Sequence, residues 1–205
     1  MITSIVTGDI IKSRSLKNPE LWMHTLKSAL STLNADTSKW EIYRGDSFQI
    51  EIPDISKSFI NAIYLKACIK MVNGLDVRLA IGIGKKTYEG NKVSESNGEA
   101  FIFSGETLES LKKNKVNLSI KTANETLNKE LNLYLKLALT FMDSWTVSSA
   151  EIVKLSIEQP DALQQELADI IGTKQDAISK RQKRAELDLI WELNSMFQQK
   201  ITTLL

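Results

Sequence analysis

The stretch QELADIIGTKQDAISKR, residues 165–181, decides how the carboxyl-terminal part of this chain folds. It predicts a short amphipathic helix, a tight turn and a second short helix. Gly172 stands where the chain leaves the first helix, a position that commonly needs a positive φ. Ala168 is small enough for the two helices to cross closely. Four apolar side chains supply the surface between them: Leu167, Ile170, Ile171 and Ile178. This is the pattern of a helix-turn-helix, whose second helix enters the DNA major groove.

The second helix of this pattern carries the candidate DNA contacts. Thr173 is expected to cap it, which places Lys174, Gln175 and Asp176 in the first turn, the part that reaches base edges. The remaining candidates suit phosphates or flanking bases: Ser179, Lys180, Arg181, Lys183 and Arg184. The alternative is a protein-binding helical hairpin with a solvated basic face. Asp176 favours that alternative, because a carboxylate repels phosphates unless it accepts from a cytosine amine.

Composition limits the other classes of protein. The chain has 205 residues, 42% of them hydrophobic, and a net charge of +1. No apolar run approaches the roughly 18 residues of a membrane span, and the first residues lack the basic and apolar segments of a signal peptide. The single cysteine, Cys68, excludes an internal disulfide, and with a single histidine a zinc site is not expected. These observations favour a cytoplasmic protein without a membrane partner, with Cys68 in the core.

Hydrophobic patterning predicts an α+β fold in two domains, residues 1–143 and 144–205. The first domain is expected to have strands at 2–7, 40–43, 48–52, 77–83 and 116–120, helices at 19–33, 55–72, 98–111 and 123–142, and a polar loop at 85–97. The first six of these elements have the βαββαβ order of a ferredoxin-like unit. The second domain is expected to be helical at 146–157, 160–171, 173–184 and 186–201.

Two aspartates form a candidate metal site in the first domain. Asp9 is expected just after the first strand, and Asp46 at the tip of the hairpin between the second and third strands. In a ferredoxin-like sheet those places adjoin, and paired carboxylates are a usual anchor for Mg²⁺, which keeps its other positions for water and nucleotide phosphates. Residues 10–14 offer backbone amides and two cations for a triphosphate. The alternative is ordinary turn chemistry, in which Gly-Asp pairs are common.

Four blocks of this domain resemble the SatD family. Thr7–Arg14 resembles its opening motif, and Arg44–Gln49 its Gly-Asp-Glu-Phe-Gln motif. Val77–Gly84 is similar to its Arg-x-Gly-Ile-Gly strand, and Ser94–Phe101 to its Gly-x-Ala-Phe/Tyr segment. The blocks span about the first 110 residues in the same order, and they also resemble, more distantly, class III nucleotidyl cyclases and diguanylate cyclases.

The resemblance implies a nucleotide site with Mg²⁺. It makes Asp9 and Asp46 the metal pair, with Ile10 as a backbone ligand. The nucleotide contacts would be Lys12, Ser13, Arg14 and Arg44. Two departures stand out: residues 102–106 lack the arginine that cyclases direct at the transition-state phosphates, and Ser47 replaces a frequent glutamate. Losing such a cation typically costs on the order of 10²-fold in rate. We therefore expect nucleotide binding without fast turnover, and assign no catalytic residue.

The terminal helix, 186–201, shows a broad apolar face and predicts a homodimer that would bind paired half-sites of double-stranded DNA. Taken together, the sequence favours a bacterial-type, DNA-binding transcriptional regulator with a nucleotide- and magnesium-sensing domain. Two alternatives stay open. One is a nucleotidyl cyclase or nucleotidyltransferase whose helical domain is accessory, and the other is an interaction module that uses neither site.

Overall fold

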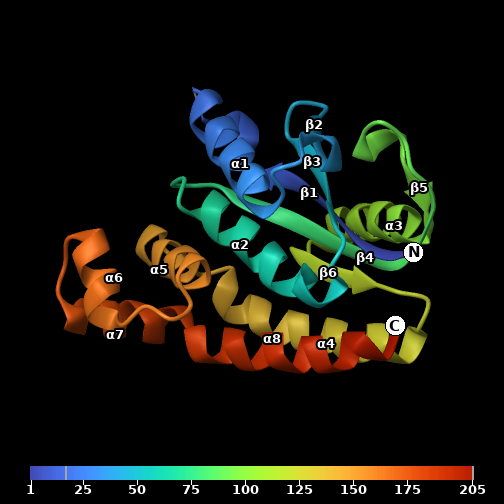
Figure 1. The fold of residues 1–205 in the computed structure, drawn as a ribbon. Helices are drawn as coiled ribbons and strands as arrows, with labels where there is room; N and C mark the ends of the chain where they lie inside the picture. The colour runs from blue at the N-terminus through green and yellow to red at the C-terminus, as the bar shows by residue number, and fades with distance from the viewer. Residues whose placement is uncertain (17, 205) are drawn as a thin grey trace.

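The computed structural model describes residues 1–16 and 18–204, which form an α+β structure (Figure 1). Leu205, the last residue after the predicted dimer helix, and Lys17 lie outside the described residues. The strands are β1 (Ile2–Ile11), β2 (Trp40–Tyr43), β3 (Ser47–Ile52), β4 (Asp76–Tyr88), β5 (Asn97–Gly98) and β6 (Leu118–Lys121). The helices are α1 (Glu20–Leu33), α2 (Ser58–Lys70), α3 (Glu99–Asn114), α4 (Glu125–Met142), α5 (Val147–Glu158), α6 (Gln164–Ile171), α7 (Gln175–Ala185) and α8 (Leu187–Ile201).

The sheet has the strand order β2-β3-β1-β4, and each strand in that order is antiparallel to its neighbour. On the other side of β4, β6 pairs with β4 in parallel. The short strand β5 pairs with the carboxyl-terminal end of β4. The end of β1, the β2–β3 turn and the start of β4 therefore meet at one edge of the sheet. That edge is where both candidate carboxylates fall.

The first strand is longer than its sequence predicts. It continues through Gly8 and Asp9 to Ile11 and is paired on both sides, so Asp9 lies within the strand and not after it. Gly8 serves packing: a Cβ there would stand 2.5 Å from the Phe48 ring and 2.9 Å from the Arg78 carbonyl oxygen. The glycine that suggests a turn is instead required by the close approach of β3 and β4.

Helices cover both faces of the sheet. Val6 and Ile10 of β1 belong to the main buried cluster, which includes side chains of α1 and α2. Ile5 points the other way and packs with Ala100 at the start of α3. The helix α3 crosses β4 so closely that a Cβ at Gly82 would collide with the backbone of α3. Alternate residues of β1 therefore serve different layers.

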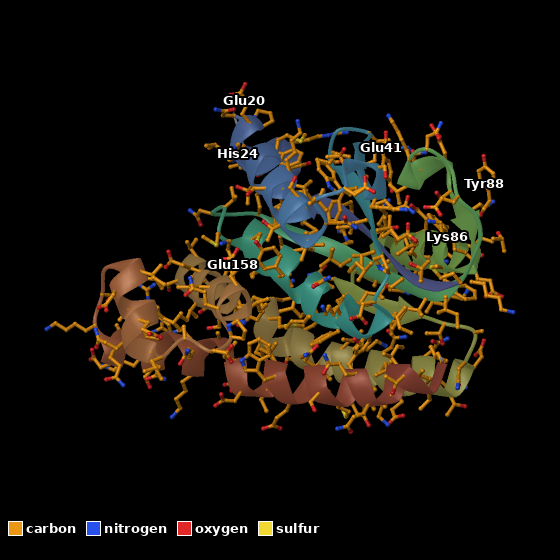
Figure 2. All side chains as sticks on the ribbon, viewed as in Figure 1. Glu20, His24, Glu41, Lys86, Tyr88 and Glu158 are labelled. Atoms are coloured by element: carbon orange, nitrogen blue, oxygen red, sulfur yellow. The ribbon has the colours of Figure 1, made fainter. Side chains whose placement is uncertain are left out.

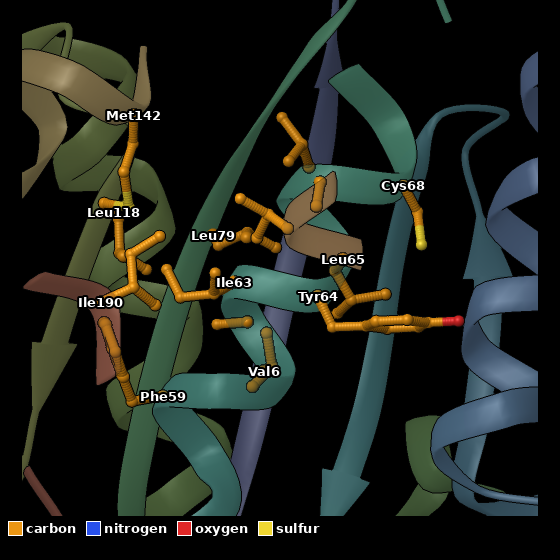
Figure 3. Close-up of a cluster of buried hydrophobic side chains, with 14 of the residues drawn as sticks. Val6, Phe59, Ile63, Tyr64, Leu65, Cys68, Leu79, Leu118, Met142 and Ile190 are labelled. Atoms are coloured by element: carbon orange, nitrogen blue, oxygen red, sulfur yellow. The ribbon is translucent and has the colours of Figure 1, made fainter. Parts of the chain in front are cut away.

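The carboxyl-terminal helices share the core of the sheet domain. The rings of Phe59 on α2 and Phe197 on α8 lie 5.7 Å apart, and Figure 3 shows Ile190 of α8 beside Phe59 and Leu118. The buried cluster is thus continuous across residue 143, where the predicted domains meet. This packing corrects one premise of the dimer prediction: much of the apolar face of α8 packs on α2 and α4 of its own chain.

A second contact holds α5 against α2. The Tyr64 hydroxyl donates a hydrogen bond of 2.7 Å to Glu158 Oε1, and Figure 2 labels Glu158 near the end of α5. The helices α6 and α7 extend from α5 to one end of the molecule, away from the sheet (Figure 1). No helix within residues 1–16 and 18–204 has the length and apolar character needed to cross a membrane.

Candidate functional site

Asp9 lies near the end of β1 and Asp46 in the β2–β3 turn, at the edge described above. Asp9 of β1 stands opposite Ser47 of β3, the residue that follows Asp46. The backbone N–H of Ile10 donates to the carbonyl oxygen of Asp46 at 3.0 Å. The hairpin turn is thereby attached to the end of β1, and the backbones of Asp9 and Asp46 are neighbours.

Asp9 has a partner that sequence patterns do not reveal. Its Oδ2 accepts a hydrogen bond of 3.1 Å from Nη1 of Arg78, which stands opposite it on β4. Its other oxygen, Oδ1, is buried and has no hydrogen-bond partner among the described residues. Burial raises the pKa of nearby Tyr43, and the charge of Asp9 adds to that rise while Arg44 opposes it. A buried carboxylate oxygen without a donor is rare, and a cation or donor would relieve its cost.

Asp46 is held by the segment after β1. Ser13 is buried, and its hydroxyl donates to Asp46 Oδ2 at 2.7 Å. The flanking cations Lys12 and Arg44 are exposed non-glycine residues with φ of 64° and 53°, a conformation that is uncommon outside turns and is frequent at binding sites. Arg14 is also exposed. The predicted nucleotide contacts therefore lie on the two segments next to the carboxylates, and of these residues Ser13 is the one that contacts a carboxylate directly.

The donor set suits magnesium only with help from a ligand. Within the part of the chain that the structure describes, no three His, Cys, Asp or Glu side chains cluster in a way that would hold a metal. Asp9 Oδ1 and the second oxygen of Asp46 are the side-chain oxygens without a side-chain donor here. Mg²⁺ commonly uses one or two carboxylates and completes its shell with water and phosphate oxygens. The residues fit that mode, in which nucleotide and metal bind together.

The helical end of the chain contains two short helices joined by a tight turn. Gly172 ends α6 with φ 76°, and Ala168 and Ile178 are fully buried between the helices, as expected. Three details correct the sequence prediction. The helix α6 begins at Gln164, where Glu166 accepts from the Leu163 N–H at 2.7 Å. Ile170 is 54% exposed and does not face α7.

The third correction concerns the cap of α7. The residue before its first turn is Lys174, not Thr173, and the structure gives it no side-chain cap. The Thr173 N–H instead bonds to the Ala168 carbonyl oxygen at 2.9 Å and closes the end of α6. Because Gly172 and Thr173 both serve the end of α6, α7 starts later than its polar residues suggest.

One face of α7 is polar and exposed. Ile178, Arg181, Gln182 and Ala185 face the protein to varying degrees. The exposed positions are Lys174, Gln175, Asp176, Ser179, Lys180, Lys183 and Arg184. Four of these are cations and one is an acid. Asp176 Oδ2 lies 3.4 Å from Nζ of Lys180, one helical turn further along α7. The negative charge of Asp176 is therefore paired with a cation of the same helix.

The inner face of α7 is fastened to α5. Arg181 Nη1 donates to Glu151 Oε2 at 2.6 Å, so the structure gives this predicted DNA contact a partner within the protein. The side chains of Gln164 and Gln182 join α6 to α7 at 2.7 Å. The helices α5, α6 and α7 thus form one packed unit whose polar face remains exposed.

A buried ionic network lies between the sheet and the start of α5, and the sequence patterns did not single it out. Lys66 is fully buried on α2, and its Nζ donates to Asp76 Oδ1 at 2.8 Å and Asp143 Oδ1 at 2.7 Å. Lys70 reaches Asp76 Oδ2 at 3.1 Å, and Asn117 reaches Asp143 Oδ2 at 3.0 Å. The available signal was two lysines four residues apart in an otherwise largely apolar helix.

Comparisons with known proteins leave these sites to be judged on their geometry. No protein-family model matches the chain, and no curated protein matches it.

Proposed function

We propose that this protein is a DNA-binding transcriptional regulator in which α7 enters the major groove. The observation that carries the proposal is the exposed cationic face of α7 on a packed unit of three helices. Lys174 and Gln175 stand in or just before its first turn, where a recognition helix meets base edges. Lys180, Lys183 and Arg184 lie further along, at positions suited to phosphates.

The same proposal includes the finer fold. The short helices α6 and α7, joined at Gly172 and supported by α5, are interpreted as a helix-turn-helix. The antiparallel order β2-β3-β1-β4 supports a ferredoxin-like unit in the first 143 residues. We also propose that the first domain is related to the SatD family. The proposed boundary between residues 143 and 144 separates a sheet-containing part from an all-helical part, and the two parts share one buried core.

A second part of the proposal is a nucleotide and magnesium site at Asp9 and Asp46. The unpartnered Asp9 Oδ1 favours it, because a bound cation would satisfy that oxygen. Ser13 orients Asp46, and Lys12, Arg14 and Arg44 supply positive charge for phosphates. The bound metal would supply charge neutralisation for those phosphates. Since α3 holds no arginine, we assign this site to sensing and not to fast turnover.

A homodimer completes the proposal. An apolar groove with a volume of about 550 Å³ runs between α4 and α8, lined by Leu137, Phe141, Leu189 and Met196. Leu137 and Leu189 are 60% and 47% exposed. Exposed Lys136 on α4 and Glu192 on α8 carry opposite charges, so a two-fold partner that sets α4 of one copy against α8 of the other joins unlike charges. A second copy of this chain is therefore the proposed occupant.

Salt-dependent binding to duplex DNA tests the central proposal. Replacing Lys183 and Arg184 with glutamine is expected to lower affinity and to reduce the salt slope by about two, one for each phosphate contact removed. The matched control is Lys27→Gln with Lys129→Gln, which removes the same charge from exposed sites on α1 and α4. An equal loss in both pairs would assign binding to net charge alone and would overturn the proposal.

A further inference from the structure

A polar cavity of about 690 Å³ lies where the sheet domain meets the start of α5. The end of β1, the end of α2, the start of β4, the end of α3 and the α4–α5 connection all contribute to its wall. Its charged lining consists of Lys12, Lys70, Arg78, Lys112, Lys115 and Asp76, together with Asp143. A volume of this size is typical of sites for small organic ligands, which commonly occupy ~300–1,000 Å³.

The charge of the lining is unbalanced. Asp76 and Asp143, the two acids, are already held by the buried Lys66 and by Lys70. Arg78 is engaged by Asp9, which lies outside the cavity lining. Three further cations remain at the cavity, Lys12, Lys112 and Lys115, and the acids of its wall pair with Lys66 and Lys70 instead. Within the described residues, neither Lys12 nor Lys115 pairs with a carboxylate, and Lys112 has only an exposed pair with Glu109 on its own helix.

The position of these cations is set by the backbone. Lys12 follows β1 with φ 64°, and Lys115 ends α3 with φ 54°. Both are uncommon conformations for a lysine, and they occur where a helix ends or a turn begins. Asn117 adds an amide, and the side chains of Trp145 and Val147 add apolar surface to the same wall. The cavity thus combines multiple positive charges with room for an organic group.

We propose that this cavity binds a small molecule that carries two or more phosphate charges. Protein side chains supply the positive charge there, so binding does not require a metal ion. Lys12 and Arg78 also adjoin the Asp9 and Asp46 site, so the two sites are neighbours. Lys112 and Lys115 belong to the cavity and not to that site. The inference stands independently of DNA binding.

A regulatory consequence rests on the proposed DNA-binding function. Trp145, in the wall of the cavity, donates from Nε1 to the carbonyl oxygen of Ala185 at the end of α7. A ligand against Trp145 is therefore in direct contact with a residue that holds α7. Such a ligand alters DNA affinity only if it binds the two arrangements of α7 with different affinities.

Calorimetric titration with inorganic pyrophosphate, in EDTA and without DNA, tests the site itself. We expect saturable binding by the wild-type protein. The pair Lys112→Gln and Lys115→Asn is expected to weaken it at least ~10-fold, as loss of charged hydrogen bonds requires. Asparagine suits the left-handed position of residue 115. The matched control is Lys113→Gln with Lys129→Gln, which removes the same charge from two exposed positions that do not line the cavity.

A labelling experiment on the wild-type protein avoids any dependence on the variants. Pyrophosphate is expected to slow acetylation of Lys112 and Lys115 and to leave Lys113 unchanged, as measured by mass spectrometry. Absence of saturable binding in EDTA, or equal effects at the control and cavity lysines in either experiment, would overturn the proposal. Since neither readout uses DNA, failure here is distinguishable from failure of the DNA-binding proposal.

Discussion

Trp145 and Ala185 are 40 residues apart in sequence, yet the indole Nε1 of Trp145 donates a buried hydrogen bond of 3.0 Å to the carbonyl oxygen of Ala185. Trp145 follows α4 at the junction with the sheet domain, whereas Ala185 is the last residue of α7. Both are at least 95% buried. The bond joins the end of α7 to the body of the protein, so a shift of α7 relative to the sheet domain would have to break it.

Removing that bond should change both stability and DNA binding. Trp145→Phe leaves the Ala185 carbonyl oxygen without its partner and is expected to lower the free energy of unfolding by about 1–3 kcal/mol. Urea denaturation measures the loss, and fluorescence anisotropy measures DNA affinity. Trp40→Phe is the matched control, since it removes an indole bond to the Asn34 carbonyl oxygen far from α7. Equal DNA affinity in both variants would contradict a positioning role for Trp145.

The buried lysine of α2 should be among the most sensitive positions in the chain. Lys66→Gln removes the cation between Asp76 and Asp143 and leaves two carboxylates facing each other. We expect a loss of about 3–5 kcal/mol in the free energy of unfolding, as for other buried pairs that lose one partner. Lys154→Gln, which breaks a more exposed pair with Glu158, should cost less than about 1 kcal/mol. Similar losses of unfolding free energy in the two variants would contradict the special role of the buried Lys66.

Cys68 should be inert in the folded protein. Burial raises the pKa of its thiol to about 12, and the side chain is 2% exposed. Because the folded pKa lies above that of the unfolded thiol, the group stabilises the fold fully below about pH 8.5, and that contribution is lost as the pH rises through the folded value. A disulfide reagent at pH 8 should label the chain in urea and not in buffer. Rapid labelling in buffer would disprove this burial.

The carboxylate site makes a prediction about magnesium. ATP or GTP with Mg²⁺ should raise the melting temperature of the wild-type protein, and EDTA should cancel the rise, because the nucleotide binds here together with the metal. Asp46→Asn should remove the effect, because it discharges one of the two carboxylates. Asp54→Asn is a control at an exposed carboxylate. Persistence of the full shift in Asp46→Asn would exclude this site.

The order of elements was predictable because each is long enough to show its own period. The predicted strands and helices of the first 142 residues appear in the expected order, and the α+β class follows from them. The predicted polar loop at 85–97 was wrong in part, because β4 continues to Tyr88 and the short strand β5 was not expected. Gly172 was predictable as well, since few other residues adopt its φ. In these cases the preference of the local sequence is the same as the conformation in the folded chain.

Contacts between distant segments were not predictable in this way. Gly8 suggests a turn, but Phe48 and the backbone of β4 demand a residue without a side chain. The apolar face of α8 suggests a dimer, but Phe59 lies more than a hundred residues earlier and covers part of it. The partnership of Asp9 with Arg78 depends on strand register. Periodicity describes one element at a time and does not specify which surface covers it.

The most direct test of the central claim is selection from random DNA duplexes at moderate salt, comparing the wild-type protein with the Lys174→Ala/Gln175→Ala variant. These two residues stand at the exposed beginning of α7. We predict that the wild type enriches a defined sequence motif and that the variant loses it, because base edges are contacted from the first turn. No enrichment by the wild type, or an unchanged motif in the variant, would contradict the account.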